Sequence, residues 1–195
     1  MQEKTDYNMS FTSGGLLEKE SRVLAKEYLQ AKDWAIASQK ILNDNMFQYR
    51  TLVATKRIIQ EIKSRFSYLN EDALQLIVSG FPNETKQILW FAICQKHKFI
   101  FDFVKEVVRE KYFIGQFELE NYDYDAFFNK KMLEYLSLEK ITDGSRGKLK
   151  QVLFKMLREV GVLNNQNYIQ AVVPTQRVLH IISNLAPQYA TIFVN

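Results

Sequence analysis

The stretch Gly144-Ser-Arg-Gly-Lys-Leu-Lys-Gln-Val-Leu-Phe-Lys-Met-Leu-Arg158 carries five cationic side chains and no acidic one. The whole chain is more balanced, with 26 basic and 22 acidic residues among 195. Apolar residues recur every three or four positions through the stretch and on to Val160, which predicts a helix with one buried face. The cations fall on the other face, so the pattern predicts a surface that meets phosphate groups.

The residues after this helix predict a hairpin. Gly161 suits the left-handed conformation that often ends a helix. Val162-Leu163 and residues 168–173 flank a polar run, which is typical of two short strands around a turn. A helix followed by a hairpin is the order of a winged helix. The predicted wing residues are Asn164, Asn165, Gln166 and Asn167.

A second basic segment lies between Asn45 and Phe66, where five cations stand against the single acid Glu61. Two further helices are predicted upstream of it, over residues 16–31 and 34–42, and Asp33 is the predicted N-cap of the second. Three helices with a basic third one predict a helix-turn-helix-like unit. The apolar residues assigned to the buried face of the third helix are Leu52, Ile58, Ile59, Ile62, Phe66 and Leu69.

Charge also divides the chain into three parts. The net charge is +3 over residues 1–70, −2 over residues 71–120 and +3 over residues 121–195. We therefore predict an N-terminal helix-turn-helix-like unit, a central helical scaffold and a C-terminal winged-helix unit over these ranges. The predicted fold class is mainly α, with a helical core, winged helix-turn-helix-like units near both ends and a short β-hairpin wing.

The middle of the chain offers few helix stops, because it is poor in proline and glycine. Residues 70–72 predict the start of a helix that runs through Val78. Residues 84–113 predict either one long helix or two helices broken near residues 96–98. Glycines 144 and 147 disfavour helix at the start of the C-terminal basic segment. The other predicted elements are a connection over residues 115–124, a helix over residues 125–136 and a short helix over residues 137–141.

Cysteine content and hydropathy predict a soluble, cytoplasmic protein without a membrane partner. Cys94 is the only cysteine, so no intramolecular disulfide can form, which fits a reducing compartment. The first 15 residues lack the apolar core of a signal peptide. The longest apolar run, residues 88–94, is far shorter than the roughly 20 residues that span a bilayer.

Enzyme chemistry has little support in the sequence. Cys94 and His97 are the one close pair of nucleophile and base, and burial in an apolar helix explains them more simply. His180 is isolated, and two histidines with one cysteine do not make a zinc site. We predict no enzyme activity, cofactor, metal site or small-molecule substrate. The acids that could surround magnesium, although a solvated loop fits them better, are Glu118, Glu120, Asp123 and Asp125.

Both basic helices predict binding through phosphate contacts with weak sequence preference, because lysines outnumber the side chains that read bases with two hydrogen bonds. Neutralising about five phosphates would give a log-log salt slope of roughly −4.5. Trp34 and Trp90 are predicted core residues. The predicted DNA-binding residues are Arg50, Thr51, Lys56, Arg57, Gln60, Lys63, Arg146, Lys148, Lys150, Gln151, Lys155 and Arg158.

A series of short motifs runs along nearly the whole chain. These motifs are Ser13–Leu17, Glu20–Arg22, Asp33-Trp34, Asn45, Arg50-Thr51, Lys56–Ile58, Phe101–Arg109 and Lys148–Leu163. Together they resemble the BrxA family of bacterial BREX (bacteriophage exclusion) systems. The resemblance implies a mostly helical protein with a winged-helix unit at each end, which acts as a non-enzymatic, double-stranded DNA-binding accessory of a multi-protein antiviral complex, with other BREX components as partners.

Two other functions remain open from the residues. Helical bundles with basic faces also bind RNA, so an RNA-binding protein of the antitermination type fits the charge pattern. A protein–protein adaptor fits as well, in which the apolar central helices or the tail Leu185–Val194 dock a larger defence component. The turn Ser13-Gly14-Gly15 could bind an anion, although a plain capping role is favoured.

Overall fold

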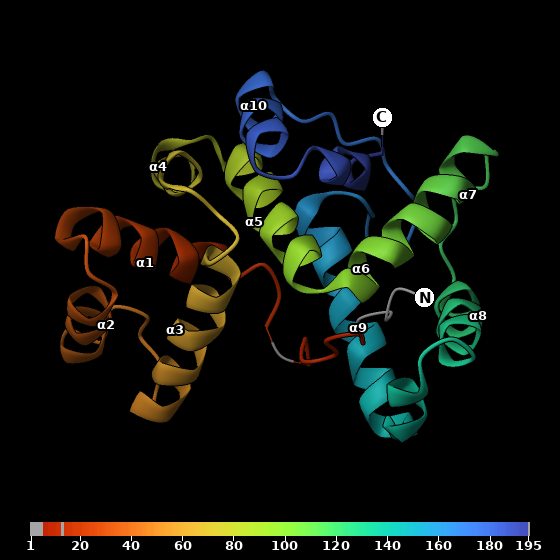
Figure 1. The fold of residues 1–195 in the computed structure, drawn as a ribbon, viewed down its shortest axis with the longest axis horizontal. Coiled ribbons are helices and arrows are strands. Elements are labelled where there is room, and N and C mark those ends of the chain that lie inside the picture. The colour runs from red at the N-terminus through yellow and green to blue at the C-terminus, as the bar shows by residue number, and fades with distance from the viewer. Residues whose placement is uncertain (1–5, 13, 195) are drawn as a thin grey trace. The chain divides into compact units, whose positions relative to one another are not determined.

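The computed structural model describes residues 6–12 and 14–194, and in that range the protein is mainly helical (Figure 1). The described residues form two compact units, each assembled from separate stretches of the chain. We name them after the helices α3 (Leu52–Phe66) and α9 (Asp143–Val160). The α3 unit holds residues 16–96 and 174–187, and the α9 unit holds the described residues of 1–15, 97–173 and 188–194. The division into residues 1–70, 71–120 and 121–195 stays a prediction.

The α3 unit is built around α5 (Pro82–Lys96), whose residues 87–94 are all buried. It contains the fully buried Trp90 and Cys94, and it contacts α3 and the helices α1 (Glu18–Ala31), α4 (Glu71–Ser79) and α10 (Gln176–Leu185). A helix without a polar face belongs in a core. α1 contacts α2 (Trp34–Asn43), α3 and α4 in turn.

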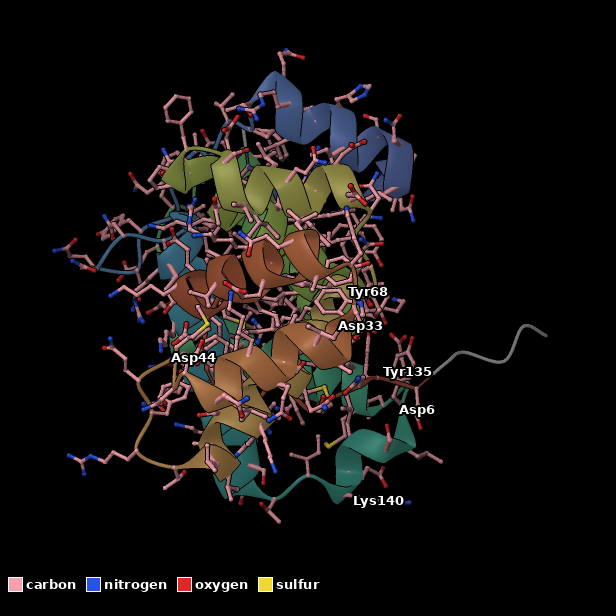
Figure 2. All side chains as sticks on the ribbon, turned by 90° about the vertical axis from the view of Figure 1, so that its left-hand side faces the viewer. Asp6, Asp33, Asp44, Tyr68, Tyr135 and Lys140 are labelled. Atoms are coloured by element: carbon pink, nitrogen blue, oxygen red, sulfur yellow. The ribbon has the colours of Figure 1, made fainter. Side chains whose placement is uncertain are left out.

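Polar caps fix where these helices begin. The Asp33 carboxylate accepts the N–H groups of Ala35 and Ile36 at 2.6 and 3.0 Å, and the Asn70 side chain accepts the N–H of Ala73 at 3.0 Å. Such bonds satisfy amides that have no partner within the helix. Figure 2 shows Asp33 at one end of α2 and Asp44 at the other. The predicted starts of α2 and α4 are confirmed.

One cation of the basic segment 45–66 is buried in the α3 unit. Arg65 is fully buried, and its guanidinium donates to the Glu61 carboxylate at 2.9 Å and to the Leu16 carbonyl at 3.3 Å. Lys96 donates to the other Glu61 oxygen at 2.8 Å. Burial alone would raise the pKa of Glu61, but the charges and hydrogen bonds of Arg65 and Lys96 hold that pKa below its usual range.

The second stretch of chain in the α9 unit begins at His97, where the long apolar segment breaks. α5 ends at Lys96 and α6 begins at Lys98, so of the two alternatives left open by the sequence the structure shows the break near residues 96–98. Figure 1 shows α6 and α7 in line, and a π-helical turn joins them. The elements of this unit besides α9 are α6 (Lys98–Phe103), the π-helical η1 (Val104–Val108), α7 (Arg109–Phe113), α8 (Asn121–Met132), and the 3-10 segments η2 (Leu136–Lys140) and η3 (Pro187–Ile192).

Aromatic rings form the core of the α9 unit. The Phe99 ring lies 5.2 Å from that of Phe127 and 5.8 Å from that of Phe128, both on α8. Tyr7, from the N-terminal segment, packs 4.3 Å from the Tyr135 ring. Figure 2 shows Asp6 beside Tyr135. The N-terminal segment is therefore part of this core.

Several predicted boundaries in this unit are wrong. The helix predicted over residues 125–136 runs from Asn121 to Met132. It begins at Asn121 because Asp123 accepts the N–H of Glu120 at 2.7 Å in a capping box. The connection predicted over residues 115–124 is correspondingly shorter. The short helix predicted over residues 137–141 is the 3-10 segment over 136–140.

After α9, Gly161 adopts a φ of 89°, which confirms the predicted left-handed cap. Antiparallel bridges join Leu163 to Ile169 and Glu118 to Tyr168, and they are isolated bridges rather than extended strands. Among the described residues, no helix combines the length and apolar character needed to cross a membrane.

Candidate nucleic-acid interface

The first candidate surface is the exposed side of α3. Thr51 caps this helix, and its hydroxyl accepts the N–H of Ala54 at 3.2 Å. Lys56, Arg57 and Gln60 are exposed and follow one another at the spacing of a single helix face. Arg50 is exposed just before the cap, whereas Lys63 is half-buried. We call Lys56, Arg57 and Gln60 the α3 row.

Two aliphatic side chains are exposed in the first turn of α3. Leu52 was predicted to be buried, and this is wrong, because 59% of it is exposed. Its neighbour Val53 is 78% exposed. Burial along α3 begins one turn later, at Thr55. Periodicity shows which face of a helix is apolar, but not how far along the helix its neighbours reach, so this exposure could not be predicted from the sequence.

The connection between α2 and α3 covers residues 44–51. It is longer than the three or four residues typical of a helix-turn-helix. Asn45 and Gln48 have positive φ values of 43° and 55° in this connection. Asparagine tolerates this conformation better than most residues. The three helices of the predicted unit are thus present and in mutual contact, with an extended turn before the basic one.

The second candidate surface is the exposed side of α9. The helix begins at Asp143, and the Thr142 hydroxyl accepts the N–H of Ser145 at 3.3 Å. Gly144 and Gly147 therefore lie inside the helix, although glycine disfavours helix at such positions. A Cβ atom built at either glycine would have no neighbour within 4 Å. Packing inside the protein does not require these glycines.

Lys148, Gln151 and Lys155 are exposed at three- and four-residue spacing along α9. We call them the α9 row. The Lys148 ammonium donates to the Gln151 side chain at 3.0 Å, and Lys155 pairs with Glu159 at 3.6 Å. Exposed pairs of this kind contribute little to stability, so a phosphate group can displace them at small cost.

Two other cations of α9 are bonded to α8. Arg146 donates to the Asp125 carboxylate at 3.2 Å, and Lys150 donates to its other oxygen at 2.9 Å. The Arg146 guanidinium also lies 4.5 Å from the centre of the Phe128 ring. Asp125 was not predicted to have this role, because no pattern within one helix shows an ion pair to another helix. Arg146 and Lys150 must leave it before they can bind a phosphate directly.

Some polar side chains of the turn after α9 form hydrogen bonds within the α9 unit. The Asn164 side chain accepts the N–H groups of Gln166 and Tyr168, both at 2.9 Å. Arg158 donates to the Asn167 side chain at 2.8 Å. Asn165 and Gln166 are exposed. Of the four predicted wing residues, two are thus engaged within the α9 unit and two extend into solvent.

A hollow brings several predicted residues of the α9 unit together. It contains cationic and amide groups and no acidic side chain, so its electrostatic character suits an anion. Its lining residues are Asn121, Gly147, Lys150, Gln151, Phe154, Arg158 and Asn167.

Catalytic candidates have other roles in the structure. Cys94 and His97 are each fully buried, and burial raises the pKa of the Cys94 thiol well above its usual value. Within residues 6–12 and 14–194 there is no group of three or more histidine, cysteine, aspartate or glutamate side chains that could hold a metal ion. Asp123 pairs with Lys111 at 2.8 Å.

His180 is exposed on α10, and Trp90 is a core residue as predicted. Ser13, in the turn for which a capping role was favoured over anion binding, lies outside the described residues.

Fold and surface together define a mainly helical protein in which two separate helices each present an exposed row of cationic and amide side chains. A family model described as BrxA matches residues 5–185. The chain belongs to the BrxA family.

Individual relatives agree with this assignment. A protein described as BREX protein BrxA, from Bacillus cereus (strain H3081.97), is 30% identical over 128 residues, which cover 66% of this chain and 64% of that relative. Another BREX protein BrxA, from Escherichia coli O9:H4 (strain HS), is 27% identical over 177 residues, or 90% of this chain and 83% of the relative. The crystal structure of an uncharacterized protein from Magnetospirillum magneticum has the same fold, with a TM-score of 0.87 at 20% identity over 98% of this chain and 100% of that one.

Proposed function

We propose that this chain is a non-enzymatic accessory protein of a BREX phage-defence system and that it binds double-stranded DNA mainly through phosphate contacts. The names of its relatives support the first part. The observation that carries the second part is the α3 row, where Lys56, Arg57 and Gln60 are exposed along one helix face. Arg50 adds a further exposed cation just before that helix.

The order of elements supports a winged-helix interpretation of the α9 unit. α8, η2 and α9 follow one another, and only Ile141 and Thr142 separate η2 from α9. The bridge between Leu163 and Ile169 closes the turn that would serve as the wing. In this arrangement α9 lies in or beside a groove of the DNA, and Asn165 and Gln166 reach the neighbouring backbone.

Phosphate contacts would dominate because the exposed cations are well placed for them and few side chains can read bases. Arg50, Lys56 and Arg57 in the α3 unit, with Lys148 and Lys155 in the α9 unit, give about five phosphate contacts. We therefore expect weak sequence preference and a log-log salt slope of roughly −4.5. The hollow lined by Lys150 and Arg158 could hold an additional phosphate.

The test is a salt series with the full chain. Fluorescence anisotropy of a labelled duplex of about three helical turns should show binding that weakens steeply with salt. Unlabelled duplex DNA should compete better than structured RNA of the same length. Binding that does not change with salt would contradict phosphate contact, and stronger competition by RNA would favour the RNA-binding alternative.

One observation favours a second function, that of a protein adaptor. Phe113, Ile114 and Phe117, around the end of α7, are 56%, 66% and 45% exposed. Apolar side chains gathered in one place often mark a protein-binding surface. If the protein is purely an adaptor, the full chain will bind no nucleic acid in the salt series, and Ile114→Asp will abolish its assembly with the defence complex.

A further inference from the structure

We propose that Leu52 and Val53 contact the C5-methyl groups of thymine, so that α3 gives the DNA contact a preference for thymine-bearing sites. This inference rests on the proposed function. The two side chains occupy the first turn of α3, directly after the Thr51 cap, and are 59% and 78% exposed. Helix propensity does not account for Val53, since valine is a weaker helix former than alanine.

The surroundings of these side chains indicate what they contact. Val53 is followed at three-, four- and seven-residue spacing by Lys56, Arg57 and Gln60, so it shares their face of the helix. Glu61, the one acid of the helix, is turned to Arg65 and Lys96 instead. The surface is therefore apolar at its start, with cationic and amide side chains beyond.

The major groove of duplex DNA matches this arrangement. Its rims carry phosphates, and its floor presents the thymine C5-methyl group, which apolar side chains contact in direct readout. In helix-turn-helix proteins the residues at the start of the recognition helix reach the base edges. Lys56 and Arg57 would then meet phosphates while Val53 and Leu52 meet methyl groups, and Gln60 is placed for a base edge or a phosphate.

The same contact would separate DNA from RNA. Duplex RNA contains uracil, which lacks the C5-methyl group, and its major groove is too deep and narrow for side chains to read. The α9 row has no equivalent, because the first two turns of α9 expose aspartate, glycine, serine and lysine. Methyl readout is therefore assigned to α3 alone.

The experiment compares two duplexes of identical sequence, one with thymine and one with uracil at every thymine position, at one fixed salt concentration. The full chain and its Val53→Ala and Leu52→Ala variants are titrated against both by anisotropy. Val173→Ala is the matched control, because Val173 is also highly exposed, at 71%, but lies in the α9 unit. Thermal unfolding of each variant checks that the fold is kept.

We expect the native chain to bind the thymine duplex roughly fourfold more tightly for each methyl group that it buries. Val53→Ala should weaken binding to the thymine duplex and leave the uracil duplex nearly unchanged, whereas Val173→Ala should keep the native preference. Equal binding of both duplexes by the native chain overturns methyl readout but leaves DNA binding standing. A preference that survives in both the Val53→Ala and Leu52→Ala variants overturns its assignment to α3, and no binding of either duplex overturns the proposed function itself.

Discussion

On α3, the row and two aliphatic side chains of the first turn are exposed, whereas on α9 two of five cations are bonded to Asp125 and a third to Asn167. The segments that form α3 and α9 have similar charge and similar apolar periodicity. The difference arises from an acid on a neighbouring helix and from a turn that folds back on α9. A basic helix is therefore available for binding only to the extent that the rest of its unit leaves its charges in solvent.

The largest effect should come from the cation that α3 buries rather than exposes. Replacing Arg65 by methionine leaves Glu61 with Lys96 alone in a buried environment and removes the bond to the Leu16 carbonyl. We expect the free energy of unfolding to fall by about 3–5 kcal/mol. Urea unfolding followed by circular dichroism measures it. The control is Lys56→Met, which replaces an exposed cation on the same helix and should change the free energy of unfolding by less than about 0.5 kcal/mol. An equal loss of stability in both variants would contradict the contrast between the buried Arg65 and the exposed Lys56.

Acid should weaken the same buried cluster. Because the pKa of Glu61 is held below its ordinary 4.5 in the folded chain, the cluster stabilises fully above that pH and loses its contribution as the pH falls below it. Glu61→Gln should therefore flatten the dependence of stability on pH below about 4.5. Thermal unfolding between pH 3 and 7 measures this. An unchanged pH dependence in the variant would show that other carboxyl groups dominate acid unfolding.

Neutralising the exposed rows separately tests which helix contributes more to DNA binding. We expect Lys56→Gln with Arg57→Gln to reduce the salt slope by roughly 1.8 and to weaken binding by at least about tenfold at low salt, because each lost phosphate contact removes about 0.9 from the slope. Lys148→Gln with Lys155→Gln should have a smaller effect on affinity. Lys26→Gln, at an exposed position on α1, is the control for net charge. A larger loss from the α9 pair would reverse the comparison.

Removing Asp125 should make α9 more like α3. Asp125→Asn frees Arg146 and Lys150 from their ion pairs, so two further cations become available to phosphate. We expect a few-fold gain in DNA affinity and a salt slope steeper by up to roughly 1.8. The control Glu110→Gln removes one exposed acid from α7 and should produce only the small effect of net charge. If both variants gain equally, the pairing on Asp125 does not limit binding.

Local signals predicted much of this fold. Asp33 and Asn70 set the starts of their helices and Gly161 ends α9, because a cap depends on the residues next to it. The exposure of Leu52 and the burial of Arg65 depend instead on how far neighbouring helices extend. The bond between Asp125 and α9 joins residues 21 and 25 positions apart, and no periodic pattern within one helix contains it.

The smallest effect should come from the two glycines of the α9 face. Alanine at Gly144 or Gly147 meets no neighbouring atom, so each substitution should raise the free energy of unfolding by roughly 0.5–1 kcal/mol through better helix propensity. A helix backbone that approaches DNA closely would explain why these two positions hold glycine. In that case the methyl group of the substituted alanine should weaken DNA binding. Asn129→Ala, on an exposed position of α8, should stabilise its helix without affecting DNA. If the Gly144→Ala and Gly147→Ala variants are more stable and bind DNA as the native chain does, the start of α9 stands away from the duplex, and α3 is left as the helix that contacts the bases.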